Sequence, residues 1–241
     1  MEMNRLDAIR HAEANSHIQA YTSNELFVSG SWLAKPVKTV LDILPLMAGC
    51  SEIHGLDLGC GVGRNSIPVA QGFSNIPCRL DCVDILELAI EKLRVNAEKF
   101  GVSHAVRGII SSIDDYTIST DSYDLIMAIS ALEHIGSKQM FDQKLMQIRD
   151  GIRANGIVCL IVNTGVVERD KITKKQLPPQ FEVILKTDEF LADLESVFSC
   201  WQIIRQTVVH QKYDIPRECG TAELEAEVVT YVARKKEQYN G

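Results

Sequence analysis

The stretch Leu56-Asp57-Leu58-Gly59-Cys60-Gly61-Val62-Gly63 decides how this chain folds. An apolar run from Ile53 to Leu58 predicts a buried strand, and three glycines in a G-x-G-x-G spacing follow it directly. Glycine lets the backbone turn sharply and come close to a ligand, and the next helix presents free N–H groups at its N-terminus. The pattern therefore predicts a strand–turn–helix unit that holds a nucleotide-like ligand.

The residues after this turn narrow the kind of ligand. A dinucleotide site has its third glycine one residue later, and Arg64 occupies that position here. The spacing fits a turn that wraps around an amino-acid carboxylate and a nucleoside and receives no pyrophosphate. Asp84 ends the next predicted strand, where a carboxylate accepts hydrogen bonds from both hydroxyls of a ribose. A nicotinamide-dependent oxidoreductase stays open as the disfavoured alternative.

From residue 53 onward, short apolar runs alternate with amphipathic stretches, which is typical of repeated βαβ units. The pattern predicts an α/β fold, with a doubly wound, mostly parallel seven-stranded sheet and a C-terminal antiparallel strand pair. Helices fill the gaps; one stops at Gly101, one starts after an N-cap at Ser137, and one is capped by Thr187. The predicted strands are 53–58, 79–83, 105–110, 123–129, 157–162, 201–210 and 226–232, with a long polar loop over 163–180.

The first 50 residues differ from this pattern and predict a helical extension ahead of a domain over 51–241. Arg5 to Ala20 and Val37 to Leu44 have helical patterns. The segment from Tyr21 to Trp32 between them is rich in turn formers and aromatic residues, and it is interpreted as a lid.

Composition excludes several classes of protein. The chain has 241 residues and a formal net charge of −7, which argues against a surface that binds nucleic acid through many phosphates. Its seven cysteines lack metal-type pairing, and neither a secretory signal nor an apolar run of membrane-spanning length is present. The sequence predicts a cytoplasmic protein with no metal site, no membrane contact and no nucleic-acid partner, and it leaves the oligomeric state open.

At this point the sequence resembles the class I S-adenosylmethionine-dependent methyltransferases, which have a Rossmann-like fold. The resemblance rests on the glycine turn, Asp84, Ser112-Ile113-Asp114-Asp115, and Tyr123-Asp124-Leu125-Ile126 leading to Ser130-Ala131-Leu132-Glu133-His134-Ile135. It implies that the glycines line the methionine part of the cofactor, Asp84 and Ile85 the ribose, and Ser112 and Ile113 the adenine. Many members have Asp where Ser112 stands. The full set of cofactor contacts expected here is Asp57, Gly59, Cys60, Gly61, Gly63, Arg64, Asp84, Ile85, Ser112, Ile113, Ala128 and Trp32.

A second, weaker resemblance is to methyltransferases of the tellurite-resistance type, which include thiol- and chalcogen-methylating enzymes. Gly63-Arg64-Asn65-Ser66, the segment ending in Arg79 to Asp84 and the run from Thr230 to Lys236 carry it. It implies a small-molecule acceptor of that kind, with Arg64 neutralising the methionine carboxylate or, in the alternative, facing solvent.

Methyl transfer asks little of protein side chains, because the sulfonium is already activated and needs an aligned, desolvated nucleophile. Where the acceptor carries a proton, a base can help, and the candidates are Glu133, His134 and His210. A structural role is the competing interpretation of each. Because no side chain is obligatory, a non-catalytic module that binds S-adenosylmethionine also stays open.

Overall fold

The computed structural model describes residues 5–217 and 220–237 and is built around one twisted sheet. The strands follow the order β3-β2-β1-β4-β5-β8-β7. The first five are parallel: β1 (Ile53–Leu58), β2 (Cys78–Asp84), β3 (Val106–Ile110), β4 (Tyr123–Ile129) and β5 (Ile152–Asp170). The C-terminal strands β7 (Gln202–Arg217) and β8 (Gly220–Arg234) are antiparallel, which confirms the predicted fold class and the terminal strand pair.

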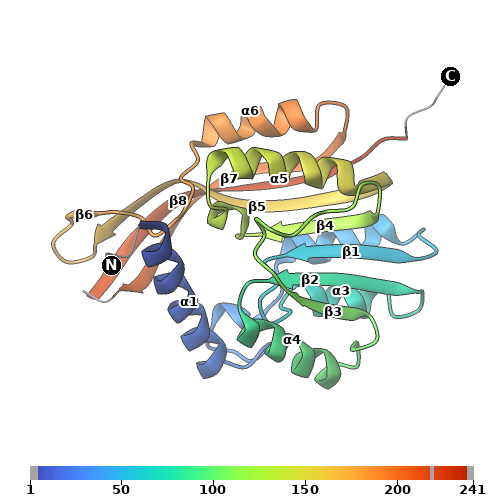
Figure 1. The fold of residues 1–241 in the computed structure, drawn as a ribbon, viewed down its shortest axis with the longest axis horizontal. Coiled ribbons are helices and arrows are strands. Elements are labelled where there is room, and N and C mark those ends of the chain that lie inside the picture. The colour runs from blue at the N-terminus through green and yellow to red at the C-terminus, as the bar shows by residue number, and fades with distance from the viewer. Residues whose placement is uncertain (1–4, 218–219, 238–241) are drawn as a thin grey trace.

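Helices cover both faces of the sheet, so the molecule has three layers (Figure 1). On one face, α2 (Lys38–Ile43), α3 (Ser66–Gly72) and α4 (Glu87–Lys99) enclose a core that includes Ile67, Ile90 and Leu93. On the other face, α5 (Lys138–Gly151) and α6 (Thr187–Val197) enclose a second core around Phe141 and Phe190. Short 3-10 turns lie at Trp32–Ala34, Leu44–Met47 and Leu132–His134, labelled η1, η2 and η3.

Two predicted helix boundaries are confirmed and one is wrong. Ser137 is the N-cap of α5, and its side chain accepts a hydrogen bond from the Met140 N–H. Gly101 follows the end of α4 with φ of +73°, the left-handed conformation that suits glycine after a helix. Thr187 is not the N-cap of α6: Lys186 precedes the helix, and the Thr187 hydroxyl bonds to Glu227 instead.

The strand boundaries differ most in the region predicted as a polar loop. Strand β5 runs on to Asp170, and a short strand β6 (Gln176–Leu177) pairs with it, so the sheet has an eighth strand. The extended part of β5 and the paired part of β8 form an arm, here called the β5–β8 arm. Within it, Val166, Leu224 and Ala226 form a small apolar core of their own. The arm also holds a buried ion pair, with Arg217 donating from Nε and Nη2 to Glu168 at 2.6 and 2.9 Å. In addition, residues 111–122 between β3 and β4 contain no helix, although helices were expected in every gap.

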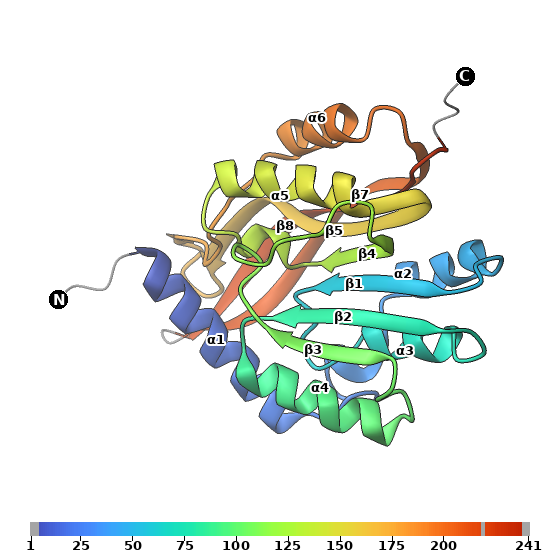
Figure 2. The ribbon, with the colours of Figure 1, turned by 45° about the vertical axis from the view of Figure 1, so that its right-hand side comes forward.

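The N-terminal segment divides into two parts. Helix α1 (Arg5–Ser23) lies beside the carboxyl ends of the parallel strands, between the β5–β8 arm and α4 (Figure 2). The following residues join the main core, where Leu26, Leu33, Val40 and Ile43 are buried. Only α1 is therefore set apart from the domain. In the described ranges, none of the helices combines the length and the apolar character needed to cross a bilayer.

Candidate cofactor and acceptor site

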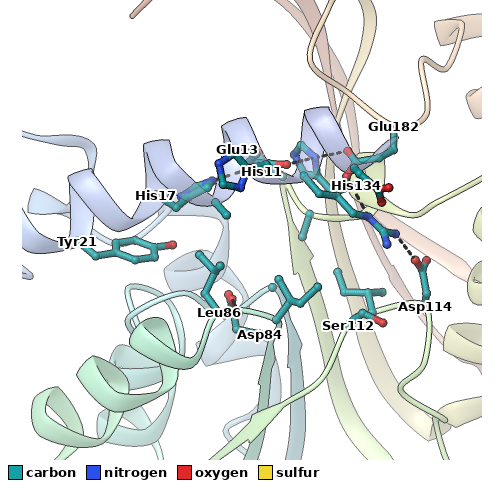
Figure 3. Close-up of a pocket in the computed structure, with 18 residues that line it drawn as sticks. His11, Glu13, His17, Tyr21, Asp84, Leu86, Ser112, Asp114, His134 and Glu182 are labelled. Carbon is teal, nitrogen blue, oxygen red and sulfur yellow. Dashed lines mark hydrogen bonds and ion pairs between the residues drawn. The ribbon is translucent and has the colours of Figure 1, made fainter. Parts of the chain in front are cut away.

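The strand order reverses between β1 and β4, and ligands of open α/β sheets bind outside the carboxyl ends of the strands at such a point. A pocket of about 430 Å³ lies there, between α1 and the loops that follow the strands (Figure 3). It is lined by Asp7, Arg10, His11, Glu13, Ala14, His17, Tyr21, Gly59, Asp84, Ile85, Leu86, Ser112, Ile113, Asp114, Ser130, Ala131, His134 and Glu182.

The glycine turn forms one wall because no side chain fits there. Gly59 has φ of +73°, and a Cβ on it would come within 2.4 Å of the Ala131 Cβ. Gly61 has φ of +53°, and a Cβ there would lie 2.7 Å from the hydroxyl of Tyr21. Burial raises the pKa of Tyr21, so this phenol stays a neutral donor over the turn at pH 7.

Asp84 fixes the shape of this turn from the end of β2. Its Oδ2 accepts from the Gly61 N–H at 2.8 Å and its Oδ1 from the Leu86 N–H at 2.9 Å. Burial raises the pKa of this carboxyl, and the two N–H donors oppose the shift. Each oxygen keeps a further lone pair, and the residue lines the pocket, so Asp84 is placed to accept from ligand hydroxyls.

Asp57 lies behind the turn and supports it. The carboxylate is buried and accepts from the Ser66 hydroxyl at 2.5 Å, which ties the end of β1 to the start of α3. Burial raises the pKa of Asp57 to about 6. The hydrogen bond from Ser66 lowers this pKa, and the nearby charge of Asp84 raises it by a smaller amount. A charge without a cationic partner is thus held inside the domain at neutral pH.

This burial predicts how stability depends on pH. Because the folded-state pKa of about 6 is above the ordinary value of 3.8 for an aspartate, the stability contribution of Asp57 is greatest below pH 4 and is lost as pH rises through 6. A shift of that size corresponds to about 3 kcal/mol at pH 7. The variant Asp57→Asn should therefore gain unfolding free energy relative to the wild type between pH 4 and pH 7, as measured by urea denaturation. Asp121→Asn, at an exposed position, is the control substitution. A difference between Asp57→Asn and the wild type that stays constant with pH would contradict this assignment.

Ser112 and Ile113 form the wall at the third strand. The Ser112 hydroxyl donates to Asp115 Oδ2 at 2.7 Å and accepts from the Asp115 N–H at 3.0 Å. Ile85 faces the same space with 56% of its surface exposed, and Ile113 lies near the Gly59 turn. Two apolar side chains and a hydroxyl provide surfaces on which a planar base can pack.

The opposite end of the pocket is polar and comes from distant parts of the chain. Nδ1 of His134 lies 2.7 Å from Oε2 of Glu13 on α1 and 2.9 Å from Oε2 of Glu182, which precedes α6. Burial alone lowers the pKa of His134, but the hydrogen bonds to the two carboxylates raise it to about 10. Burial raises the pKa of Glu13, and its bonds to His134 and His17 outweigh this and lower it to about 2. With both carboxylates in contact, His134 is a cation at neutral pH and holds its proton too tightly to act as a base.

Arg10 joins α1 to this polar end. Its Nη2 donates to Asp114 Oδ2 at 2.7 Å, and its Nε lies 3.6 Å from Glu182 Oε1. Asp114 also accepts from the N–H of Gly136, so the loop after β3 and the loop before α5 meet at one carboxylate. Ion pairs, more than apolar packing, therefore hold α1 against the pocket.

Comparisons with known proteins agree with this geometry. Residues 56–156, which contain the glycine turn, Asp84 and His134, match the family described as "Methyltransferase domain". This stretch of the chain is similar to methyltransferase domains. S-adenosylmethionine is the cofactor of this family, and the residues present fit it: a turn that presents glycine to the pocket, an acceptor at Asp84 and a pocket of about 430 Å³.

The sequence relatives of the methyltransferase domain match only part of their length. The ubiquinone biosynthesis O-methyltransferase of Rickettsia canadensis (strain McKiel) is 31% identical over 111 residues, which are 46% of this chain and 42% of the relative. Other relatives are named as N-methyltransferases of plant alkaloids and as a tRNA methylcytidine methyltransferase. The chain thus spans less than half of the first of these curated relatives.

Solved structures share the fold over more of the chain. TehB from Haemophilus influenzae aligns with a TM-score of 0.64 at 18% identity, over 83% of this chain and 62% of that one. The [4+2]-cyclase SpnF aligns with a TM-score of 0.65 at 11% identity, over 98% of both chains. The same fold therefore occurs in a protein named for a different reaction.

Six of the residues predicted for the site line the pocket: Gly59, Asp84, Ile85, Ser112, Ile113 and His134. Gly61 and Gly63 shape the turn, and the buried side chains of Asp57, Cys60 and Ala128 support it from behind. Arg64 is turned away: its Nε donates to the Lys35 carbonyl, and its guanidinium lies 5.3 Å from the Trp32 ring. The side chains of Arg64 and Trp32 are not among those that line the pocket. In this arrangement Arg64 therefore does not reach a methionine carboxylate bound there.

Two of the predicted base candidates lie away from the open space. Glu133 is fully buried, and its Oε1 accepts from the Asn163 side chain and backbone N–H. His210 is exposed in the middle of β7, where its register partner on β8 is Glu227. Of the three candidates, only His134 faces the pocket.

The largest group of residues missed in the sequence comes from α1. The predicted lid, Tyr21 to Trp32, contributes only Tyr21, and the pocket is instead covered by the helix before it. A signal for this existed, because polar side chains recur every three or four residues along one face. They are Asp7, Arg10, His17 and Tyr21, and the small Ala14 lies on the same face.

Proposed function

We propose that this chain is an S-adenosylmethionine-dependent methyltransferase that acts on a small-molecule acceptor. One observation carries the proposal. A single pocket joins the glycine turn and Asp84 at one end to Arg10, Glu13, His134 and Glu182 at the other. The first end provides the contacts that a nucleoside and an amino acid need, and the second offers charged groups for another molecule.

In this proposal the bound cofactor supplies an activated methyl group, and the chain supplies position and a dry environment. Asp84 fixes the ribose, and Tyr21 stands over the turn that receives the methionine part. The acceptor lies between the turn and His134. His134, held by Glu13 and Glu182, orients the acceptor, and the rate enhancement rests on alignment.

Helix α1 is proposed to act as a cover for this site. Within α1, only Ile9 and Tyr21 are buried, which is the low apolar packing expected of a segment that opens. Opening would let the acceptor enter, and closing would exclude water from the reaction.

This cover predicts the behaviour of an Arg10→Gln variant. The change removes the ion pairs of the partly exposed Arg10 with the little-exposed carboxylates of Asp114 and Glu182, and pairs that water still reaches contribute about 0.2–1 kcal/mol. We therefore expect the amide hydrogens of α1 to exchange roughly two- to fivefold faster, while those of β1 are unchanged. A helix that exchanges at the wild-type rate would show that these ion pairs do not hold it.

The acceptor class has two candidates. Carboxylates, an arginine and a protonated imidazole at the acceptor end suit a molecule with hydroxyl, carboxylate or amine groups. A thiol or chalcogen acceptor rests on the weaker family resemblance and is the second candidate. A nucleic-acid acceptor is not expected, because the net charge is −7.

An assay with methyl-labelled S-adenosylmethionine tests the proposal and separates the alternatives. The full chain is incubated with panels of small alcohols, phenols, amines and thiols, and with tRNA. Methylation of a small molecule supports the proposal. Cofactor binding without transfer to any panel member would favour a non-catalytic module, and transfer to tRNA alone would overturn the small-molecule acceptor.

A further inference from the structure

Three side chains converge at the acceptor end of the pocket in a way that the transfer reaction does not require. Nδ1 of His134 and one carboxylate oxygen each of Glu13 and Glu182 all lie within 4.8 Å of one another. They come from α1, from η3 after β4, and from the segment before α6, so folding alone brings them together. Figure 3 shows the three side chains pointing toward one another, apart from Asp84.

We propose that Glu13, His134 and Glu182 form a binding site for a divalent first-row transition ion, such as Mn²⁺ or Zn²⁺. The role of the ion in placing the acceptor rests on the proposed function. Ion binding itself does not depend on methyl transfer.

The hydrogen-bond count favours an ion. Two carboxylate oxygens approach the same Nδ1, at 2.7 and 2.9 Å, and a single N–H cannot bond both at full strength. A metal ion would displace the proton from Nδ1 of His134 to solvent and then accept a lone pair from each of the three atoms.

The distances also fit an ion. Ligands at right angles around a metal with bonds of about 2.1 Å lie roughly 3 Å apart. The two N···O separations, 2.7 and 2.9 Å, need to open only slightly to reach this value.

Neighbouring groups hold the three ligands in place. The His134 ring stacks on Phe181 with centroids 5.3 Å apart and planes at 19°. Arg10 lies against Oε1 of Glu182, which leaves Oε2 to face His134. The Val183 N–H donates to the Glu133 carbonyl, which fixes the Glu182 segment beside η3. Supporting contacts of this kind orient metal ligands and tune their affinity.

The ligand set indicates which ions would bind. Imidazole suits zinc and iron, while carboxylates suit manganese and magnesium, so a mixed set of one histidine and two glutamates favours ions between these classes. Three protein ligands leave further positions open toward the pocket. An acceptor with a hydroxyl or carboxylate oxygen can complete the coordination, which would place that oxygen in the acceptor end of the pocket.

Manganese titration of the metal-stripped full chain tests this site, with electron paramagnetic resonance detecting free and bound Mn²⁺. We expect one Mn²⁺ per chain and a nitrogen coupling in the pulsed spectrum that is absent from His134→Gln. Glu13→Gln and Glu182→Gln should each weaken Mn²⁺ binding by ~10–100-fold or more. Substitution of residues that only support metal ligands already causes a loss of this size. Zn²⁺ is titrated in parallel by calorimetry.

The exposed acid Glu91 on α4 provides the matched control, since Glu91→Gln removes one charge outside the cluster. Circular dichroism establishes whether each variant is folded. If one of the three ligand variants does not fold, the other two test the site. No binding of either ion at millimolar concentration, or equal binding by all variants, would overturn the proposal. Binding of S-adenosylhomocysteine is measured separately, so loss of the ion site and failure of the methyltransferase assignment are distinguishable.

Discussion

Replacing Asp84 by alanine should weaken the binding of S-adenosylhomocysteine more than ~100-fold. In the wild type, the Asp84 carboxylate accepts from the Gly61 and Leu86 N–H groups and so shapes the turn. The variant loses these two hydrogen bonds and also the proposed contact with the ribose. Hydrogen bonds to charged groups contribute about 1.5–3 kcal/mol each, and ~3 kcal/mol corresponds to a factor of more than 100 in the dissociation constant. Isothermal titration calorimetry measures the change.

The graded control for this prediction is Asp84→Asn. The amide keeps one oxygen acceptor and loses the other, so its affinity should fall between those of the wild type and of Asp84→Ala. Circular dichroism of both variants separates loss of binding from loss of fold. Affinities within about threefold of the wild type for Asp84→Ala would show that this carboxylate does not hold the cofactor, since such a change is less than ~1 kcal/mol.

Replacing Gly59 by alanine should lower the free energy of unfolding by about 2–5 kcal/mol, because strain and crowding act together. A side chain at the left-handed φ of +73° costs about 1–2 kcal/mol, and overpacking a close-packed site costs about 1–3 kcal/mol. The crowding is specific, since the new Cβ would lie 2.4 Å from the Ala131 Cβ. Chemical denaturation monitored by fluorescence gives the value.

Gly101 provides a matched control, because its φ is also +73° but no atom lies within 4 Å of an added Cβ. Gly101→Ala should therefore cost only the conformational part, about 1–2 kcal/mol. Equal losses for the two variants would mean that the contact between the turn and Ala131 is looser than the structure indicates.

The cofactor end of the site was predictable because its residues lie in short segments, each of which has a recognisable local sequence pattern. The glycine turn, Asp84 and Ser112-Ile113 each follow a strand directly, and parallel strands bring their carboxyl ends to one edge. The fold class followed from the same alternation of strands and helices. Element type could thus be inferred without knowing any long-range contact.

The acceptor end could not be predicted in this way, because it depends on contacts between remote residues. Arg10 and Asp114 are 104 positions apart, and His134 and Glu182 are 48 apart. Neither pair has a spacing that a local pattern would reveal. The β5–β8 arm was missed for a related reason: Glu168 and Arg217 neutralise each other inside it, so charged residues occupy positions where apolar ones mark a strand.

The most direct test of the central claim is calorimetric titration of the full chain with S-adenosylmethionine, S-adenosylhomocysteine and NAD under one set of conditions. We expect one molecule of either adenosyl ligand per chain, competition between the two, and no heat of binding from NAD. Absence of binding at millimolar S-adenosylmethionine and S-adenosylhomocysteine, or saturable binding of NAD in their place, would contradict the assignment of the pocket at Gly59 and Asp84.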